Sequence, residues 1–139
     1  MPIETTINRS LTDLHPAIRE DVFELVHEVN VALGRMGETM RFEVFETYRS
    51  PERQAYLLRR GDSKSGPWQS AHQYGLAADI VPQVNGRWTW DVGSDRWTML
   101  ATYAVRHSLS VPISWDRAHV QSPLFGIAKG AIRTSGGST

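Results

Sequence analysis

The chain has 139 residues, a formal net charge of zero and 40% hydrophobic residues, which suits one ordinary domain with a core of its own. It contains no cysteine, so disulfides, zinc–thiolate sites and cysteine nucleophiles are excluded. The neutral charge provides no electrostatic basis for binding nucleic acid or an acidic membrane surface.

The N-terminal segment, MPIETTINRS, does not have the basic and then apolar pattern of a signal peptide. No apolar run in the sequence approaches membrane-spanning length. We therefore expect a protein that is made in the cytoplasm without a signal peptide and is not stably inserted in a membrane. We also expect it to be a monomer.

The first predicted helix covers residues 15–37. Pro16 suits the first turn of a helix, and either Gly34 or Gly37 can end it. Apolar residues recur along one face of this helix at Ile18, Val22, Leu25, Val29 and Leu33.

A strand, a helix and a loop are predicted next. Residues 40–48, MRFEVFETY, alternate between apolar and polar side chains, which is typical of a strand. Residues 50–61 predict a short helix that Ser50 caps and Gly61 ends. Residues 61–69, GDSKSGPWQ, predict a polar loop.

The following segment predicts a hairpin. Residues 76–82, LAADIVP, are expected to form a strand that Pro82 closes, and an Asn-Gly pair indicates a hairpin turn within residues 80–91. Residues 94–109 predict a second amphipathic helix.

The rest of the chain predicts extended pieces broken by a turn over residues 111–121, VPISWDRAHVQ. Residues 129–139 are rich in Gly and Ser and are expected to be a flexible tail. Helices mixed with antiparallel hairpins indicate a single α+β domain, an antiparallel sheet with flanking helices, over residues 1–128.

Five histidines are candidates for chemistry. For His15, His27 and His107 we favour roles at the surface or at helix ends. His72 and His119 differ from them because each has an aspartate nearby in the sequence.

Asp79 lies in a strand-like apolar stretch, SAHQYGLAADIV, where an ionised carboxylate is costly unless a cation balances it. If side chains alternate along the strand, Gly75 and Ala77 lie on the face of Asp79 and leave room for a bound cation. A pairing of Asp79 with an arginine, with His72 capping a turn, explains the segment equally well.

Asp116 and His119 are three residues apart, so they reach neighbouring positions only if the backbone bends near Arg117. Three protein ligands and an open position for water define a catalytic zinc site, and imidazole and carboxylate are accepted ligands. His72, Asp79 and His119 would supply such a set. Asp116 would then lie close to the metal, where a general base belongs.

Arg49 is a further candidate because it follows the predicted strand and directly precedes a capped helix. A planar cation at this junction could bind a peptide carboxylate or a developing oxyanion. A surface arginine that pairs with Glu46 or Glu52 is an equally good interpretation.

Two motifs and two upstream segments form a recognisable pattern: Ser70-x-His72-x-x-Gly75-x-Ala77-x-Asp79, Asp116-x-x-His119, TYRSPERQAYLL and LHPAIREDV. Over about residues 10–122 this pattern resembles the zinc peptidases that cut peptidoglycan stem peptides. These are the D-alanyl-D-alanine carboxypeptidases, the vancomycin-resistance dipeptidases and the phage L-alanyl-D-glutamate endopeptidases, which share the Hedgehog/DD-peptidase fold.

The resemblance implies that His72, Asp79 and His119 bind Zn²⁺. It also implies that Asp116 is the catalytic base. Arg49 matches the arginine that binds the substrate and stabilises the tetrahedral intermediate.

Further positions match the family only in part. Ser70 matches a residue near the amino end of the substrate, and Gln54 matches a glutamine that we expect to support its helix. Val120 and Gln121 stand where an aromatic residue and an acid are common. The segment SLSVPIS before the second motif is short and lacks a Trp-Gly-Gly sequence.

We therefore expect a zinc metallopeptidase that acts on the stem peptides of the bacterial cell wall. The LHPAIRE segment and an aspartate at position 116 favour an endolysin-like L-alanyl-D-glutamate endopeptidase, associated with a phage or virion. A D-alanyl-D-alanine carboxypeptidase is the first alternative. A wall-binding module of the same fold without activity is the second, and a purely structural zinc site is a weaker one.

Overall fold

The computed structural model describes residues 3–66 and 69–125. Its elements are η1 (Ile3–Thr5), η2 (Leu11–Asp13), α1 (Pro16–Arg35), β1 (Arg41–Glu46), α2 (Pro51–Arg60), η3 (Ala71–Tyr74), β2 (Ala77–Val84), β3 (Arg87–Trp88), α3 (Ser94–Arg106) and β4 (His119–Gln121). The predicted tail, residues 129–139, and the predicted domain end at residue 128 lie outside the described residues. Within the described part, none of the helices has the length and apolar character needed to cross a membrane.

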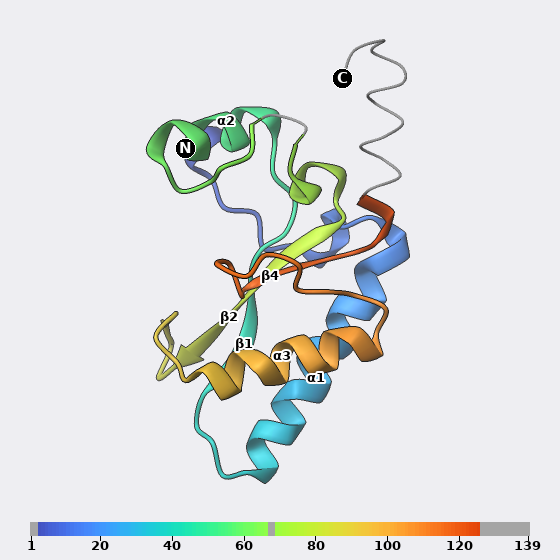
Figure 1. Cartoon of the computed structure of the whole chain (residues 1–139), viewed down its shortest axis with the longest axis vertical. Helices are drawn as coiled ribbons and strands as arrows, with labels where there is room; N and C mark the ends of the chain where they lie inside the picture. Colours follow the sequence, from blue (N-terminus) through green and yellow to red (C-terminus); the bar gives the residue numbers. More distant parts are fainter. Residues whose placement is uncertain (1–2, 67–68, 126–139) are drawn as a thin grey trace.

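Strand β2 is the centre of a small antiparallel sheet (Figure 1). Strand β1 pairs along one edge of β2, while β3 and β4 pair with opposite ends of the other edge. The β2–β3 hairpin turns through Asn85 and Gly86, which have φ angles of 52° and 76° and confirm the predicted Asn-Gly turn.

Helices α1 and α3 pack against each other, and α1 also contacts β1. Helix α2 lies apart from them, beside η1 (Figure 1). The ring of Trp97 on α3 meets that of Phe42 on β1 edge-on, with centroids 5.8 Å apart. The buried residues of α1 are those of the predicted apolar face: Ile18, Val22, Leu25, Val29 and Leu33.

The helix ends follow local signals in the sequence. The Nδ1 atom of His15 accepts the first-turn backbone N–H at 3.0 Å, which confirms a capping role. Ser50 caps α2, and Gly61 ends it with a φ of 80°. Gly34 lies inside α1, whereas Gly37, with a φ of 77°, follows its end.

Pro82 does not close β2, since the strand continues to Val84. Opposite Pro82 lies Phe42, whose backbone N–H and C=O both bond to the side chain of Asn30 on α1, each at 2.8 Å. The backbone groups of Phe42 therefore point away from β2. Phe42 and Pro82 therefore form a pair without hydrogen bonds between the strands. The missing N–H of Pro82 costs β1 no hydrogen bond.

Gly75 does not lie in the strand but follows η3 with a left-handed φ of 69°. The N–H of His15 donates to the Gly75 carbonyl at 2.9 Å, and a Cβ on Gly75 would lie 2.9 Å from the same nitrogen. The prediction that Gly75 leaves room beside Asp79 is therefore wrong. The glycine instead allows η3 to contact the start of α1.

Candidate metal centre

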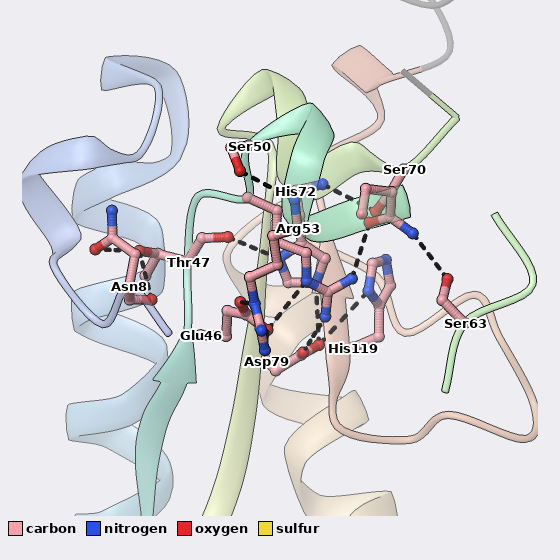
Figure 2. A network of polar contacts seen from close by, with 12 residues as sticks. Asn8, Glu46, Thr47, Ser50, Arg53, Ser63, Ser70, His72, Asp79 and His119 are labelled. Atoms are coloured by element: carbon pink, nitrogen blue, oxygen red, sulfur yellow. Dashed lines mark hydrogen bonds and ion pairs between the residues drawn. The ribbon is translucent and has the colours of Figure 1, made fainter. Parts of the chain in front are cut away.

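Asp79 lies where three strands meet at one level. It is opposite Glu46 on β1 and opposite His119 on β4. Opposed residues share a face of the sheet, so the three side chains gather on one side (Figure 2). A bulge in β1 sets this register, because the extra residue Phe45 brings Glu46 rather than itself opposite Asp79.

His72 reaches the same place from η3 and is fully buried. The hydroxyl of Ser70 accepts the His72 backbone N–H at 3.3 Å, and the His72 carbonyl accepts the Arg49 backbone N–H at 3.1 Å. The ring Nδ1 lies 2.7 Å from the carbonyl oxygen of Thr47. Because a carbonyl only accepts, Nδ1 carries the proton and Nε2 faces Asp79 Oδ1, 3.1 Å away.

His119 approaches the same carboxylate oxygen from β4. Its Nε2 lies 2.7 Å from the amide oxygen of Gln121 and donates to it. Its Nδ1 lies 3.7 Å from Asp79 Oδ1. The rings of His72 and His119 are 5.0 Å apart between centroids, so both imidazoles converge on one oxygen.

The charge states differ among the three side chains. Burial lowers the pKa of His72. Burial also disfavours the ionised form of Asp79, but His72, His119 and Arg49 outweigh it and hold the pKa of Asp79 well below its ordinary value. For His119, burial is outweighed by Asp79, and the pKa is raised above 6.5.

This arrangement fits a metal ion. The lowered pKa of His72 favours its neutral form, in which Nε2 and Asp79 Oδ1 turn lone pairs toward each other, and a cation bound to both atoms would relieve this contact. One ligand atom from each of His72, Asp79 and His119 lies within 4.8 Å of the others, and all three side chains are buried. Two imidazoles and a carboxylate form a donor set that zinc accepts.

Asp116 lies beside this group, before a turn that leads into β4. The predicted bend is present, since the N–H of His119 donates to the Asp116 carbonyl at 3.2 Å. Burial raises the pKa of the Asp116 carboxyl, and the negative charge of Asp79 raises it further. The structure thus brings Asp116 into the neighbourhood of the three candidate ligands.

All three nitrogens of the Arg49 guanidinium are engaged in the site. Nε donates to Glu46 Oε1 at 3.0 Å, Nη1 to Gln54 Oε1 at 3.2 Å and Nη2 to Asp79 Oδ2 at 2.9 Å. The predicted pair with Glu46 is therefore formed, and so is an arginine pair with Asp79. The side chain is 12% exposed, so Arg49 is not a surface arginine.

Glu46 and Arg53 are part of the site, although Glu46 is predicted only as a partner of Arg49 and Arg53 is not predicted. Glu46 is 1% exposed and bonds through both oxygens to Arg53. Because Glu46 ends β1 and Arg53 lies in α2, no single helical or strand periodicity relates the two positions. The one sequence signal for this pair is an acid at the end of a strand that is followed, seven residues later, by a base in the next helix.

Gln54 and Ser70 have structural partners. The Gln54 amide donates to Ser63 Oγ at 2.8 Å and to the Ser65 carbonyl at 2.6 Å, so it fastens the loop after α2. The expected role of Gln54 is to support its own helix, but its side-chain amide bonds to the loop that follows the helix. Ser70 is buried and caps η3, and a role near the amino end of a substrate stays a prediction.

A cleft of about 530 Å³ is lined by Asp79, Arg49 and Asp116, whereas His72 and His119 are buried and are not among its lining residues. Two aromatic side chains in its lining are half exposed, Trp90 at 51% and Trp115 at 58%. Trp90 packs edge-on against Phe45, with centroids 5.1 Å apart, and Lys64 Nζ lies 4.8 Å from the ring of Trp115. The lining residues that concern the chemistry are Glu46, Arg49, Arg53, Arg60, Asp79 and Asp116.

The architecture is the α+β fold of peptidoglycan peptidases, as predicted. Among solved structures, the L-Ala D-Glu endopeptidase ChiX of Serratia marcescens superposes with a TM-score of 0.62 at 23% identity, covering 88% of this chain and 92% of that one. The LdcB LD-carboxypeptidase superposes with a TM-score of 0.60 at 15% identity, covering 86% of this chain and 64% of LdcB.

The L,D-carboxypeptidase DacB from Streptococcus pneumonia has a TM-score of 0.56 at 15% identity, covering 85% of this chain and 72% of that one. No model of a known protein family matches the sequence, and no curated protein matches it. At these identities the likeness establishes the fold, and the activity has to be argued from the site.

Proposed function

We propose that this chain is a zinc-dependent peptidase that hydrolyses peptide bonds in peptidoglycan stem peptides. The observation that carries the proposal is the convergence of His72 Nε2 and His119 Nδ1 on Asp79 Oδ1. Asp79, which both imidazoles approach, lines a cleft together with Asp116, in a fold that an L-Ala D-Glu endopeptidase and two carboxypeptidases share.

The donor set suits zinc bound by His72, Asp79 and His119. Bound there, Zn²⁺ would supply Lewis acidity for a peptide carbonyl and for a water molecule. Asp116 is the candidate general base, since its raised pKa brings the carboxyl closer to the range in which it can accept and return a proton. In this role it takes a proton from the attacking water and delivers it to the leaving amine.

The cleft suits a short peptide. A volume of about 530 Å³ lies in the range of sites that bury small ligands. Trp90 and Trp115 offer flat apolar surface to a peptide backbone. Arg60, in the last turn of α2, offers a cation to a carboxylate of the stem peptide.

Among the possible bonds, we favour the one between L-alanine and D-glutamate. The L-Ala D-Glu endopeptidase is covered over 92% of its length, against 64% and 72% for the carboxypeptidases. A D-alanyl-D-alanine carboxypeptidase is the alternative activity. A phage or virion origin remains part of the proposal, as does action on the wall after synthesis in the cytoplasm.

The test is incubation of the zinc-loaded protein with a purified stem pentapeptide, followed by mass analysis of the products. An endopeptidase releases free L-alanine and a tetrapeptide that begins with D-glutamate. A carboxypeptidase removes the terminal D-alanine instead. Binding of the pentapeptide without any cleavage would contradict the proposal and favour a wall-binding module.

A further inference from the structure

Four charged side chains form a continuous row that ends at the candidate metal ligand Asp79. Arg53, Glu46 and Asp79 of this row are labelled in Figure 2. The row runs from Arg53 through Glu46 and Arg49 to Asp79, with alternating charge. None of the four side chains is more than 13% exposed. Ion pairs shielded from water in this way hold their geometry more firmly than surface pairs do.

The two oxygens of the Asp79 carboxylate have different partners. Oδ2 accepts Arg49 Nη2 at 2.9 Å, whereas Oδ1 faces His72 and His119 at 3.1 and 3.7 Å. The guanidinium thus occupies one oxygen and leaves the other for the metal. Without it, both oxygens would be free to turn toward the metal, and the number of donors would be undefined.

Arg49 is itself held from two further sides. Its Nε bonds to Glu46 and its Nη1 bonds to Gln54. Arg53 in turn donates hydrogen bonds to both carboxylate oxygens of Glu46. Because a guanidinium is planar, fixing Nε and Nη1 also fixes the direction of Nη2.

We propose that Arg49 is a positioning residue that makes Asp79 a one-oxygen metal ligand, and that Glu46 and Arg53 hold Arg49 in place. This role differs from the substrate contact that the sequence resemblance implies for Arg49. The inference rests on the metal site of the proposed function and not on its substrate. A ligand whose orientation depends on outer partners loses metal affinity when they are removed, by about 10- to 100-fold.

The experiment measures zinc affinity by chelator competition, together with the visible spectrum of the Co²⁺-substituted protein. Arg49→Gln and Glu46→Gln should each weaken zinc binding by about 10- to 100-fold and change the cobalt spectrum, which reports the donor number. Arg49→Lys keeps the charge but cannot reach three partners, so it should also change the spectrum. Arg59→Gln and Glu43→Gln are matched controls on α2 and β1, at exposed positions.

The outcomes separate this inference from the proposed function. If the Arg49 and Glu46 variants bind zinc like the wild type and keep its cobalt spectrum, the positioning role is wrong, whatever happens to hydrolysis. Arg49→Lys keeps the test decisive if Glu46→Gln does not fold. If the wild-type protein binds no metal, both the inference and the proposed function fail.

Discussion

The Nε2 atom of His72 lies 3.1 Å from Oδ1 of Asp79, although neither atom carries a proton when the imidazole is neutral. The proton of the ring is on Nδ1, where the Thr47 carbonyl accepts it at 2.7 Å. Burial lowers the pKa of His72 and so opposes a second proton. A cation bound between the two atoms resolves this contact, which is why we regard the site as a metal centre.

Zinc binding should depend on His72. The wild-type protein is expected to bind one equivalent of Zn²⁺, and His72→Ala should lower the affinity by more than about 100-fold because a ligand is lost together with its orienting bond to the Thr47 carbonyl. Metal analysis of dialysed protein measures this. His27→Ala, at an exposed position of α1, is the control and should keep full zinc content. Equal zinc in the His72 variant would show that the ligand is misassigned.

Asp116→Asn should separate metal binding from hydrolysis. The variant keeps the three ligands and should retain zinc, while the rate on a stem peptide should fall by about 10²- to 10⁴-fold because the proton acceptor is gone. Steady-state kinetics with parallel zinc analysis tests this. Full activity in the variant would rule out Asp116 as the base.

The same substitution should stabilise the metal-free protein. The pKa of Asp116 is raised in the folded state by burial and by Asp79, so its ionisation opposes folding at neutral pH. Asp116→Asn should therefore raise the melting temperature at pH 7, and the gain should vanish below the ordinary value of 3.8, where the carboxyl is protonated in both states. Asp91→Asn, at an exposed position, is the control. A lower melting temperature at pH 7 would contradict the assigned environment.

Zinc affinity should fall as the solution becomes more acidic. The pKa of His119 lies above 6.5 because Asp79 outweighs the effect of burial, so protons compete with the metal from near neutral pH downward. Binding near that pKa should release a proton. Calorimetry in two buffers of different ionisation enthalpy measures the release. Affinity that does not change between about pH 8 and about pH 6 would argue against His119 as a ligand.

Gly75→Ala should destabilise the fold more than Gly61→Ala. Both glycines have a left-handed φ, but a Cβ at Gly75 would lie 2.9 Å from the His15 nitrogen, whereas one at Gly61 meets nothing within 4 Å. The close contact should add about 1–3 kcal/mol to the loss at Gly75. Denaturant unfolding of the two variants compares them directly. Equal losses would mean that η3 and the start of α1 can separate without cost.

The sequence carries most of the secondary structure and the three candidate ligands. The apolar spacing of α1, the caps at His15 and Ser50, and the Asn-Gly turn are local signals, and each is present as predicted. The ligand set is readable because His72 and Asp79 share one short motif. The bend between Asp116 and His119 is the turn predicted within residues 111–121, and the spacing required it only if the two side chains act together.

What the sequence could not show depends on pairing between strands. The bulge at Phe45 brings Glu46 opposite Asp79, and a change of one residue in register is invisible to an alternating pattern. Pro82 is tolerated inside β2 because of a side chain on α1, far away in sequence. The row of charges through Arg53 likewise exists only once β1 and α2 are in place.

The central claim is that this chain cuts stem peptides with a metal held by His72, Asp79 and His119. The most direct measurement follows the appearance of new amino groups when a stem pentapeptide is incubated with the protein before chelation, after chelation and after zinc is returned. We expect cleavage that stops on chelation and resumes with zinc, while His72→Ala stays inactive throughout. Cleavage that continues in the metal-free protein, or no cleavage by the zinc-loaded wild type, would contradict the claim.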